Sequence, residues 1–145
     1  MRIAYAADDA NETTSAVVAY LSAQGHEVVA PVTSGKWPDI GAAVGRAVVA
    51  GEADCGIVMC WTGTGTAIAA NKVPGVRAAL AWDPWIAKGA RLWNDANVLA
   101  MSLKRLAPDV AVEVVRAFVE TTEVDADEAG NIARLGEIER RTPST

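Results

Sequence analysis

Residues 54–72 read Asp-Cys-Gly-Ile-Val-Met-Cys-Trp-Thr-Gly-Thr-Gly-Thr-Ala-Ile-Ala-Ala-Asn-Lys, and they predict a strand, a tight glycine loop and a helix in direct succession. The apolar run from Ile57 to Met59 is typical of a parallel strand that is buried on both faces. Gly63 and Gly65 let the backbone turn with little side-chain bulk, and Thr66 begins a helical pattern. Backbone N–H groups at such a helix start lack partners, so the loop is suited to binding an anion.

Cys60 is the candidate nucleophile or base of this stretch. It would lie at the carboxyl end of the strand, where open α/β sheets bind their ligands. A thiol beside helix N-terminal N–H groups also ionises more easily than a free one. Cysteine is, however, among the most buried residue types, so a packing role for Cys60 stays open. Cys55 precedes the apolar run, and for it we favour packing.

Strands and helices alternate on either side of this stretch. We expect further strands at 3–7, 26–30, 76–82 and 98–102, and further helices at 13–24, 40–50, 84–93 and 108–120. Asp39 is expected to cap the helix that follows it. Five strands alternating with helices predict an α/β fold, a doubly wound five-stranded parallel sheet with helices on both faces.

The chain is expected to form one domain, with its α/β part at residues 1–122 and a tail at 123–145. The tail opens with the acidic run Glu123, Asp125, Asp127 and Glu128, and residues 133–141 are expected to form a short helix. Such a tail either packs on a partner subunit or is an ordinary solvated end.

Composition narrows the class of protein. The chain has 145 residues, 51% of them hydrophobic, and a formal charge of −5. This charge and a pI near 4.8 argue against nucleic acid or an anionic membrane as partner. The two cysteines lack the spacing of a disulfide scaffold or zinc site. No segment has the length of a signal peptide core or a membrane span, so we expect a cytoplasmic protein.

Four blocks of sequence together resemble a known family. They are residues 51–54, 60–72, 76–80 and 94–100, the last reading Asn-Asp-Ala-Asn-Val-Leu-Ala. In order and spacing the chain is similar, from Met1 to about Glu139, to the family of type B ribose 5-phosphate isomerase and galactose 6-phosphate isomerase. The resemblance implies a flavodoxin-like sheet, a homodimer or dimer of dimers, and active sites built between two subunits.

The resemblance also implies aldose–ketose isomerisation through an enediolate, with no metal and no nucleotide cofactor. Cys60 stands where members of the family carry a cysteine base. Thr62, Gly63, Thr64 and Gly65 match the loop that stabilises the enediolate. Some members carry a glutamate base at the position of Thr66. Asp8 matches the family's aspartate after the first strand, and Asn94 its asparagine after the fourth helix.

Several positions depart from the family pattern. Asp9 and Trp93 stand where the family has histidines. The family's histidine at the position of Trp93 is suited to opening a sugar ring. The lone histidine, His26, is expected to be a structural surface residue. The family's phosphate-binding arginines follow Gly-Gly, and here Arg134 lies nearby but out of register.

These departures predict a substrate other than ribose 5-phosphate. A sugar that arrives open-chain needs no ring-opening histidine; a small ketose, a tetrose derivative or an unphosphorylated sugar qualifies. The alternative is a non-catalytic sugar-binding or partner subunit. Trp61, Trp93 and Trp37 either line the pocket or are core or dimer contacts. The candidate catalytic residues are Cys60 and Thr62, and the candidate substrate contacts are Asp8, Asp9, Trp61, Gly63, Thr64, Gly65, Thr66, Trp93, Asn94 and Arg134.

Overall fold

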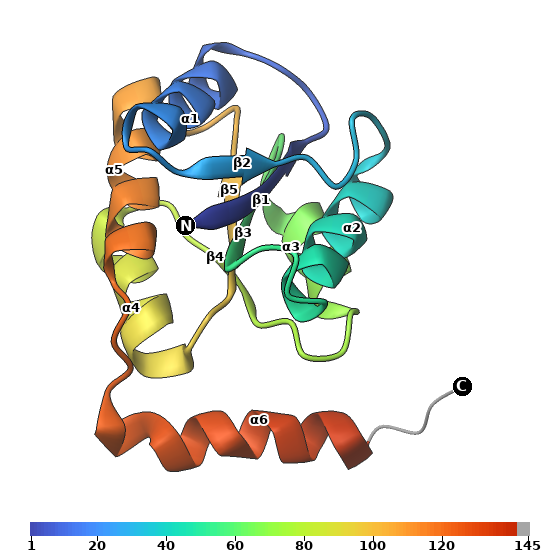
Figure 1. Cartoon of the computed structure of the whole chain (residues 1–145), viewed down its shortest axis with the longest axis vertical. Coiled ribbons are helices and arrows are strands. Elements are labelled where there is room, and N and C mark those ends of the chain that lie inside the picture. The colour runs from blue at the N-terminus through green and yellow to red at the C-terminus, as the bar shows by residue number, and fades with distance from the viewer. Residues whose placement is uncertain (142–145) are drawn as a thin grey trace.

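A computed structural model describes residues 1–141, which form a single parallel sheet covered by helices on both faces (Figure 1). The strands are β1 (Arg2–Ala7), β2 (Glu27–Val29), β3 (Cys55–Cys60), β4 (Ala78–Leu80) and β5 (Val98–Ser102). Their order in the sheet is β2-β1-β3-β5-β4, and every neighbouring pair is parallel. The predicted doubly wound five-stranded sheet is confirmed.

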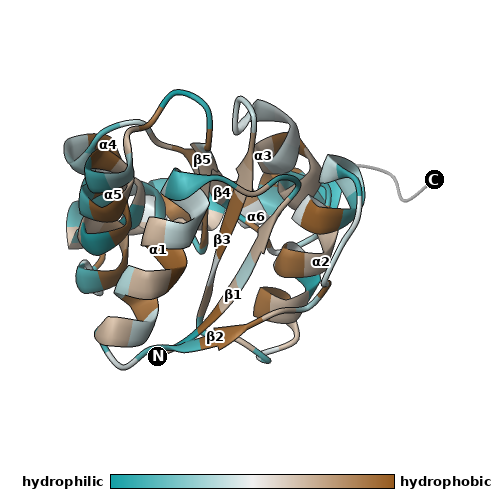
Figure 2. Ribbon diagram, turned by 90° about the horizontal axis from the view of Figure 1, so that it is seen from above, coloured by the Kyte–Doolittle hydropathy of each residue, from teal (hydrophilic) through white to brown (hydrophobic). Residues whose placement is uncertain are grey.

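Two helical layers enclose the sheet. On one face lie α1 (Glu12–Ala23), α4 (Pro84–Asn94) and α5 (Pro108–Glu120), and on the other α2 (Trp37–Val49) and α3 (Thr64–Asn71) (Figure 2). Alternate side chains of β3 supply both cores, because Ile57 and Met59 belong to the first layer's cluster and Val58 to the second's. All six residues of β3 are buried, as its apolar run predicts.

The direction of winding changes between β1 and β3. From β1 the chain passes through α1 to β2 at one edge of the sheet, then crosses back through α2 to β3 on the other side of β1. The carboxyl ends of β1 and β3 therefore flank a crevice that connections on both sides leave open, the usual ligand position in such folds.

Some predicted boundaries are wrong. Helix α2 begins at Trp37, ahead of the predicted start, and Asp39 lies inside its first turn, so it is not the cap. Proline in the first turn fixes a helical φ, which explains the early start. Strand β4 is shorter than predicted because the Arg77 N–H donates to the Asn97 side chain, 2.7 Å away, instead of joining a strand ladder.

The C-terminal segment forms a short 3-10 turn at Ala126–Glu128 and helix α6 (Ala129–Arg141), which starts earlier than the predicted 133–141 helix. No residue of α6 is buried, and the helix runs across the end of the domain near α4 (Figure 1). Its Glu139 carboxylate accepts a hydrogen bond from the Gly75 N–H (3.0 Å). The last four residues of the predicted tail, 142–145, lie outside the described residues. Among residues 1–141, no helix combines the length and apolarity needed to cross a membrane.

Candidate active site

Cys60 is the last residue of β3, and its side chain is buried, with 4% of the residue exposed. The Sγ atom accepts a hydrogen bond from the Gly63 N–H (3.1 Å) and another from the Thr66 hydroxyl (3.4 Å). Gly63 adopts φ +79°, and a Cβ there would stand 2.7 Å from Leu80 and Met101 atoms. Only glycine fits this turn, and the turn is what aims the N–H at the sulfur.

The surroundings of Cys60 favour its thiolate. Burial raises the pKa of the Cys60 thiol, but hydrogen bonds from Thr66, Gly63 and Thr62 lower it by more than burial raises it. The net pKa therefore lies below its ordinary value. Cys55, at the start of the same strand, is the opposite case. Burial raises the pKa of its thiol to about 11, and the side chain packs in the core, which confirms the predicted packing role.

Thr66 is fully buried and is held by the packing of α2 on α3. Its hydroxyl also lies 3.3 Å from the Gly63 carbonyl oxygen. Gly41 of α2 allows this approach, since a Cβ there would stand only 2.6 Å from the Thr66 carbonyl oxygen. At the exposed rim of the loop the Thr62 and Thr64 hydroxyls are 2.7 Å apart.

Gly65 owes its place to packing rather than to a turn. Its φ is not in the left-handed region, and a Cβ there would stand 2.9 Å from the Trp37 ring, which lies against the loop. The interpretation that Gly65 helps the backbone turn is therefore wrong. Trp37, Trp61 and Trp93 all stay well exposed, so the core-packing alternative for these tryptophans does not hold.

Two carboxylates follow β1 at the same edge. The Asp8 N–H donates to the Met59 carbonyl (3.1 Å), which fixes the end of β1 beside β3. Among the described residues, the Asp8 Oδ1 atom is buried without a hydrogen-bond partner. Burial, and then the charge of Asp9, raise the pKa of the Asp8 carboxyl. Hydrogen bonds from Trp61 and then from the Ala10 N–H lower the pKa of Asp9.

Trp61 joins the two strand ends. Its indole N–H donates to the Asp9 Oδ2 atom (3.0 Å), and the Lys104 ammonium lies 4.6 Å from the centre of its ring. The Ser102 hydroxyl donates to the Trp61 carbonyl (2.5 Å). Sequence reasoning missed Lys104 and Ser102, because no local pattern shows that β5, at whose end they lie, is the other neighbour of β3.

A cavity of about 860 Å³ adjoins the two carboxylates. Its walls come from the end of β1, from α1 and from the loop after β2, and they include Tyr5, Asp8, Asp9, Ser15, Val18 and Ser34. The lining mixes apolar and hydroxyl side chains, which suits a small polar ligand with a carbon skeleton. Within residues 1–141, no three His, Cys, Asp or Glu side chains gather as a metal ion would need.

Trp93, Asn94 and Arg134 lie at the opposite, amino edge of the sheet, so one chain does not bring them to Cys60. Helix α4 starts just after β4 and carries Trp93 and Asn94 at its far end, before β5. The Trp93 ring packs edge-on against Trp85, with centroids 5.5 Å apart. Arg134 is exposed on α6 and pairs with Glu137.

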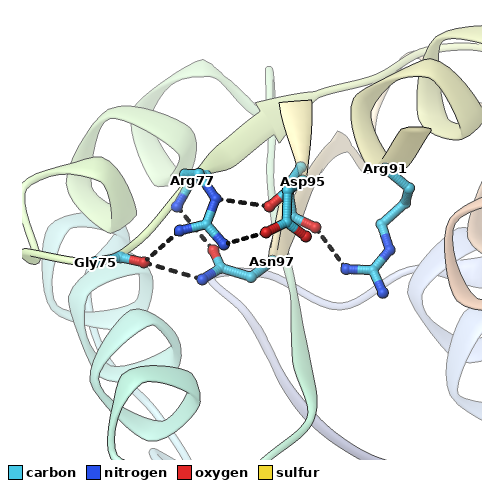
Figure 3. A network of polar contacts seen from close by, with 6 residues as sticks. Gly75, Arg77, Arg91, Asp95 and Asn97 are labelled. Carbon is cyan, nitrogen blue, oxygen red and sulfur yellow. Dashed lines mark hydrogen bonds and ion pairs between the residues drawn. The ribbon is translucent and has the colours of Figure 1, made fainter. Parts of the chain in front are cut away.

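A polar network fixes the turn after Asn94 (Figure 3). The Arg77 guanidinium donates to the Asp95 carbonyl (2.7 Å), the Asp95 carboxylate (3.1 Å) and the Gly75 carbonyl (3.2 Å). Asp95 itself has φ +48°, a conformation that needs such support outside glycine. Arg91 binds the Ala96 carbonyl on the other side (2.6 Å). The turn is thus held rigid with Asn94 exposed at its start.

His26 directly precedes β2 and is partly buried. Its Nδ1 lies 3.3 Å from the amino group of Met1. This partly exposed position agrees with the predicted surface role, and the residue lies where the chain returns into the sheet beside β1.

Comparison with known proteins gives a consistent result. Residues 3–137 match the family model described as Ribose/Galactose Isomerase. Ribose-5-phosphate isomerase B of Escherichia coli is 37% identical over 110 residues, which cover 71% of this chain and 72% of that protein. D-erythrulose-4-phosphate isomerase of Pectobacterium atrosepticum is 32% identical over 105 residues, covering 72% and 69%. The solved ribose-5-phosphate isomerase B of Clostridium thermocellum superposes with a TM-score of 0.89 at 34% identity, covering 99% of this chain and 100% of that one.

Proposed function

Because the chain belongs to the ribose/galactose isomerase family, we propose that it is a sugar-phosphate isomerase in which Cys60 is the base. The thiolate takes the proton from the carbon beside the substrate carbonyl and leaves an enediolate. The resulting thiol, whose proton exchanges with solvent, delivers a proton to the neighbouring carbon, while a second proton passes between the two substrate oxygens. Aldose and ketose interconvert with no external oxidant or reductant.

The observation that carries this proposal is the pair of hydrogen bonds from Gly63 and Thr66 to the Cys60 sulfur. Both stabilise a negative sulfur, and a base must hold its charge before it can accept a proton. Because the Gly63 N–H is engaged with the thiol, the enediolate would be bound instead by the Thr62 hydroxyl and the Gly65 N–H. Gly65 lies in the first turn of α3, where N–H groups have no helical partner.

The substrate class follows from what the site lacks. Trp93 stands in the place of a ring-opening histidine, so the substrate must arrive open-chain. A tetrose that carries its phosphate on the terminal carbon satisfies this requirement, because the hydroxyl that would close a five-membered ring is esterified. We therefore propose D-erythrulose 4-phosphate or a related four-carbon sugar phosphate. The similarity to a protein named D-erythrulose-4-phosphate isomerase supports a four-carbon substrate, and the choice over ribose 5-phosphate rests on Trp93.

Charge at the mouth of the site fits a phosphorylated substrate. Lys104 lies beside Trp61 and lowers the pKa of Asp9 through its positive charge, after the larger effects of the hydrogen bonds to that carboxylate. Its ammonium can bind a phosphate that approaches from the solvent side. Lys104 thus supplies positive charge that the missing arginine motif does not.

We further propose that two copies complete each site, in a homodimer or dimer of dimers. Asn94, Trp93 and Arg134 lie at the edge opposite Cys60, so only another subunit can bring these candidate residues to the thiol. Mixing two inactive variants tests this. Cys60→Ala and Asn94→Ala subunits, combined after partial denaturation, should regain part of the activity that each lacks alone. A mixture that stays inactive would contradict the shared site.

Deuterium exchange tests the chemistry itself. The purified protein is incubated with D-erythrulose 4-phosphate in heavy water, and deuterium beside the carbonyl is followed by NMR. We expect exchange in the wild type and in Cys55→Ala, a matched cysteine on the same strand, and none in Cys60→Ala. Absence of exchange in the folded wild type with this and other sugar phosphates would refute the enzyme and favour a non-catalytic binding or partner subunit.

A further inference from the structure

Trp61 is an exposed side chain that is nevertheless held in one position. It is 58% exposed, and an exposed tryptophan on an ordinary loop would be free to change rotamer. Here the Asp9 carboxylate accepts a hydrogen bond from the Trp61 indole N–H, and the Lys104 ammonium lies over the ring. The Ser102 hydroxyl donates a hydrogen bond to the Trp61 backbone carbonyl. Contacts from the loop after β1 and the loop after β5 thus hold the ring over solvent, while β5 holds its backbone.

The position of this ring is significant for the site. Trp61 follows Cys60 directly, and its N–H reaches the carboxylate that follows Asp8. The indole therefore bridges the carboxyl ends of β3 and β1, across the crevice where the sheet changes its direction of winding. Because Trp61 follows Cys60 directly in sequence, the ring lies at the same carboxyl edge of the sheet as the thiol.

We propose that Trp61 determines substrate length, with Asp9 as the residue that positions it. This inference rests on the proposed function, because it assumes that the ligand lies between Cys60 and the charge of Lys104. The indole is a wall beside that path, and it admits a four-carbon phosphate while it hinders longer ones. A freely rotating side chain could move aside for a longer sugar, whereas one held by Asp9 and Lys104 cannot do so without losing both contacts.

A fixed wall lowers kcat/KM for a longer substrate by more than an extra contact raises kcat/KM for a shorter one. One surplus carbon in a fitted pocket changes kcat/KM by roughly 10-fold to 200-fold. Removal of the indole should therefore narrow the preference for the short substrate by at least about tenfold. If Trp61 only contacts another subunit, its removal would change the assembly but leave the ratio of kcat/KM for the two substrates unaltered.

The test compares Trp61→Ala, Trp61→Leu and Trp82→Ala, the last an exposed tryptophan that follows β4, which β5 separates from β3. Turnover of D-erythrulose 4-phosphate and D-ribulose 5-phosphate gives the ratio of kcat/KM. Calorimetry with the unreactive acids 4-phospho-D-erythronate and 5-phospho-D-ribonate gives the ratio of Kd independently of catalysis. We expect both ratios to favour the shorter compound in the wild type and in Trp82→Ala, and to fall at least about tenfold in both Trp61 variants.

Substitutions of Asp9 distinguish the effect of the position of the Trp61 indole from the effect of its size. Asp9→Asn keeps an oxygen that accepts the indole N–H and should retain most of the length preference, whereas Asp9→Ala frees the ring and should lose it. Unchanged ratios in both Trp61 variants would overturn the inference. A wild type that binds the acids with the expected preference but turns over neither sugar would refute the proposed function and leave Trp61's role standing. Failure of the wild type to bind either acid would overturn both the proposed function and the role of Trp61.

Discussion

Replacement of Thr66 by valine probes the ionisation of Cys60 with little change in shape. The buried hydroxyl donates to the Cys60 sulfur, and valine places a methyl group where it stood. A hydrogen bond to a charged group contributes about 1.5 to 3 kcal/mol. The lower value applies here, because the O···S distance is 3.4 Å and the same hydroxyl lies near the Gly63 carbonyl. About 1.5 kcal/mol corresponds to roughly tenfold less thiolate at pH values below the pKa.

The direction of the effect is fixed by the sign of the shift. Hydrogen bonds hold the folded-state pKa of Cys60 below its ordinary value, so the folded protein releases this proton at lower pH than the unfolded chain. The associated stability is present above the unfolded-state pKa and is lost as the pH falls through the folded-state pKa. Thr66→Val raises the folded-state pKa, which moves the rise of kcat/KM to higher pH and reduces this pH-dependent stability.

The assay is a titration of thiolate absorbance in the ultraviolet, together with a pH profile of kcat/KM. Cys55 does not interfere near neutral pH, since burial holds its pKa at about 11. Thr66→Ser should restore the wild-type curve. Thr13→Val is the matched control, because it also removes one buried hydroxyl bond, to the Leu106 carbonyl at 2.9 Å, without touching Cys60. A Thr66→Val curve that coincides with the wild type would refute the role of this hydrogen bond.

Two further predictions concern stability, measured as the free energy of unfolding in urea. Arg77→Met removes donors to three oxygens at the turn after Asn94 and should cost about 2 kcal/mol. Arg2→Met breaks an exposed ion pair with Asp54 and should cost less than about 1 kcal/mol; equal losses would contradict the importance of the network. Gly41→Ala inserts a methyl group 2.6 Å from the Thr66 carbonyl and should cost about 1 to 3 kcal/mol. Gly130→Ala meets no atom within 4 Å and should be neutral or stabilising, so similar effects of the two glycine changes would exclude close packing as the cause.

Much of the fold could be predicted from local patterns. The apolar run of β3 and the glycine that turns the chain after Cys60 are short-range features, because burial on both faces and a left-handed φ leave direct traces in residue type. Asp39 shows the limit of such reasoning. A capping residue is recognised by type, but the proline beside it started the helix earlier.

In the candidate site too, contacts within one segment could be predicted from the sequence and contacts between distant segments could not. Cys60, Gly63 and Thr66 lie within seven successive residues at a strand end, its loop and the next helix, so their mutual contacts could be expected from spacing. The bonds of Trp61 to Asp9 and Lys104 join segments that are adjacent only because of the strand order. No periodicity specifies that β5 lies between β3 and β4, so the sequence alone could not bring Lys104 to Trp61. It likewise could not reveal that Trp93 lies at the edge opposite Cys60.

The central position of β3 has a consequence for synthesis of the chain. Its neighbours are β1, which leaves the ribosome well before it, and β5, which emerges only after α3, β4 and α4. Pairings between segments so distant in sequence form late in folding. Until Ser102 has emerged, the strand that ends in Cys60 has an unpaired edge and an uncovered apolar face, a state prone to association with other chains. The strand that ends in Cys60 is therefore the part of the nascent protein that a chaperone would have most reason to shield.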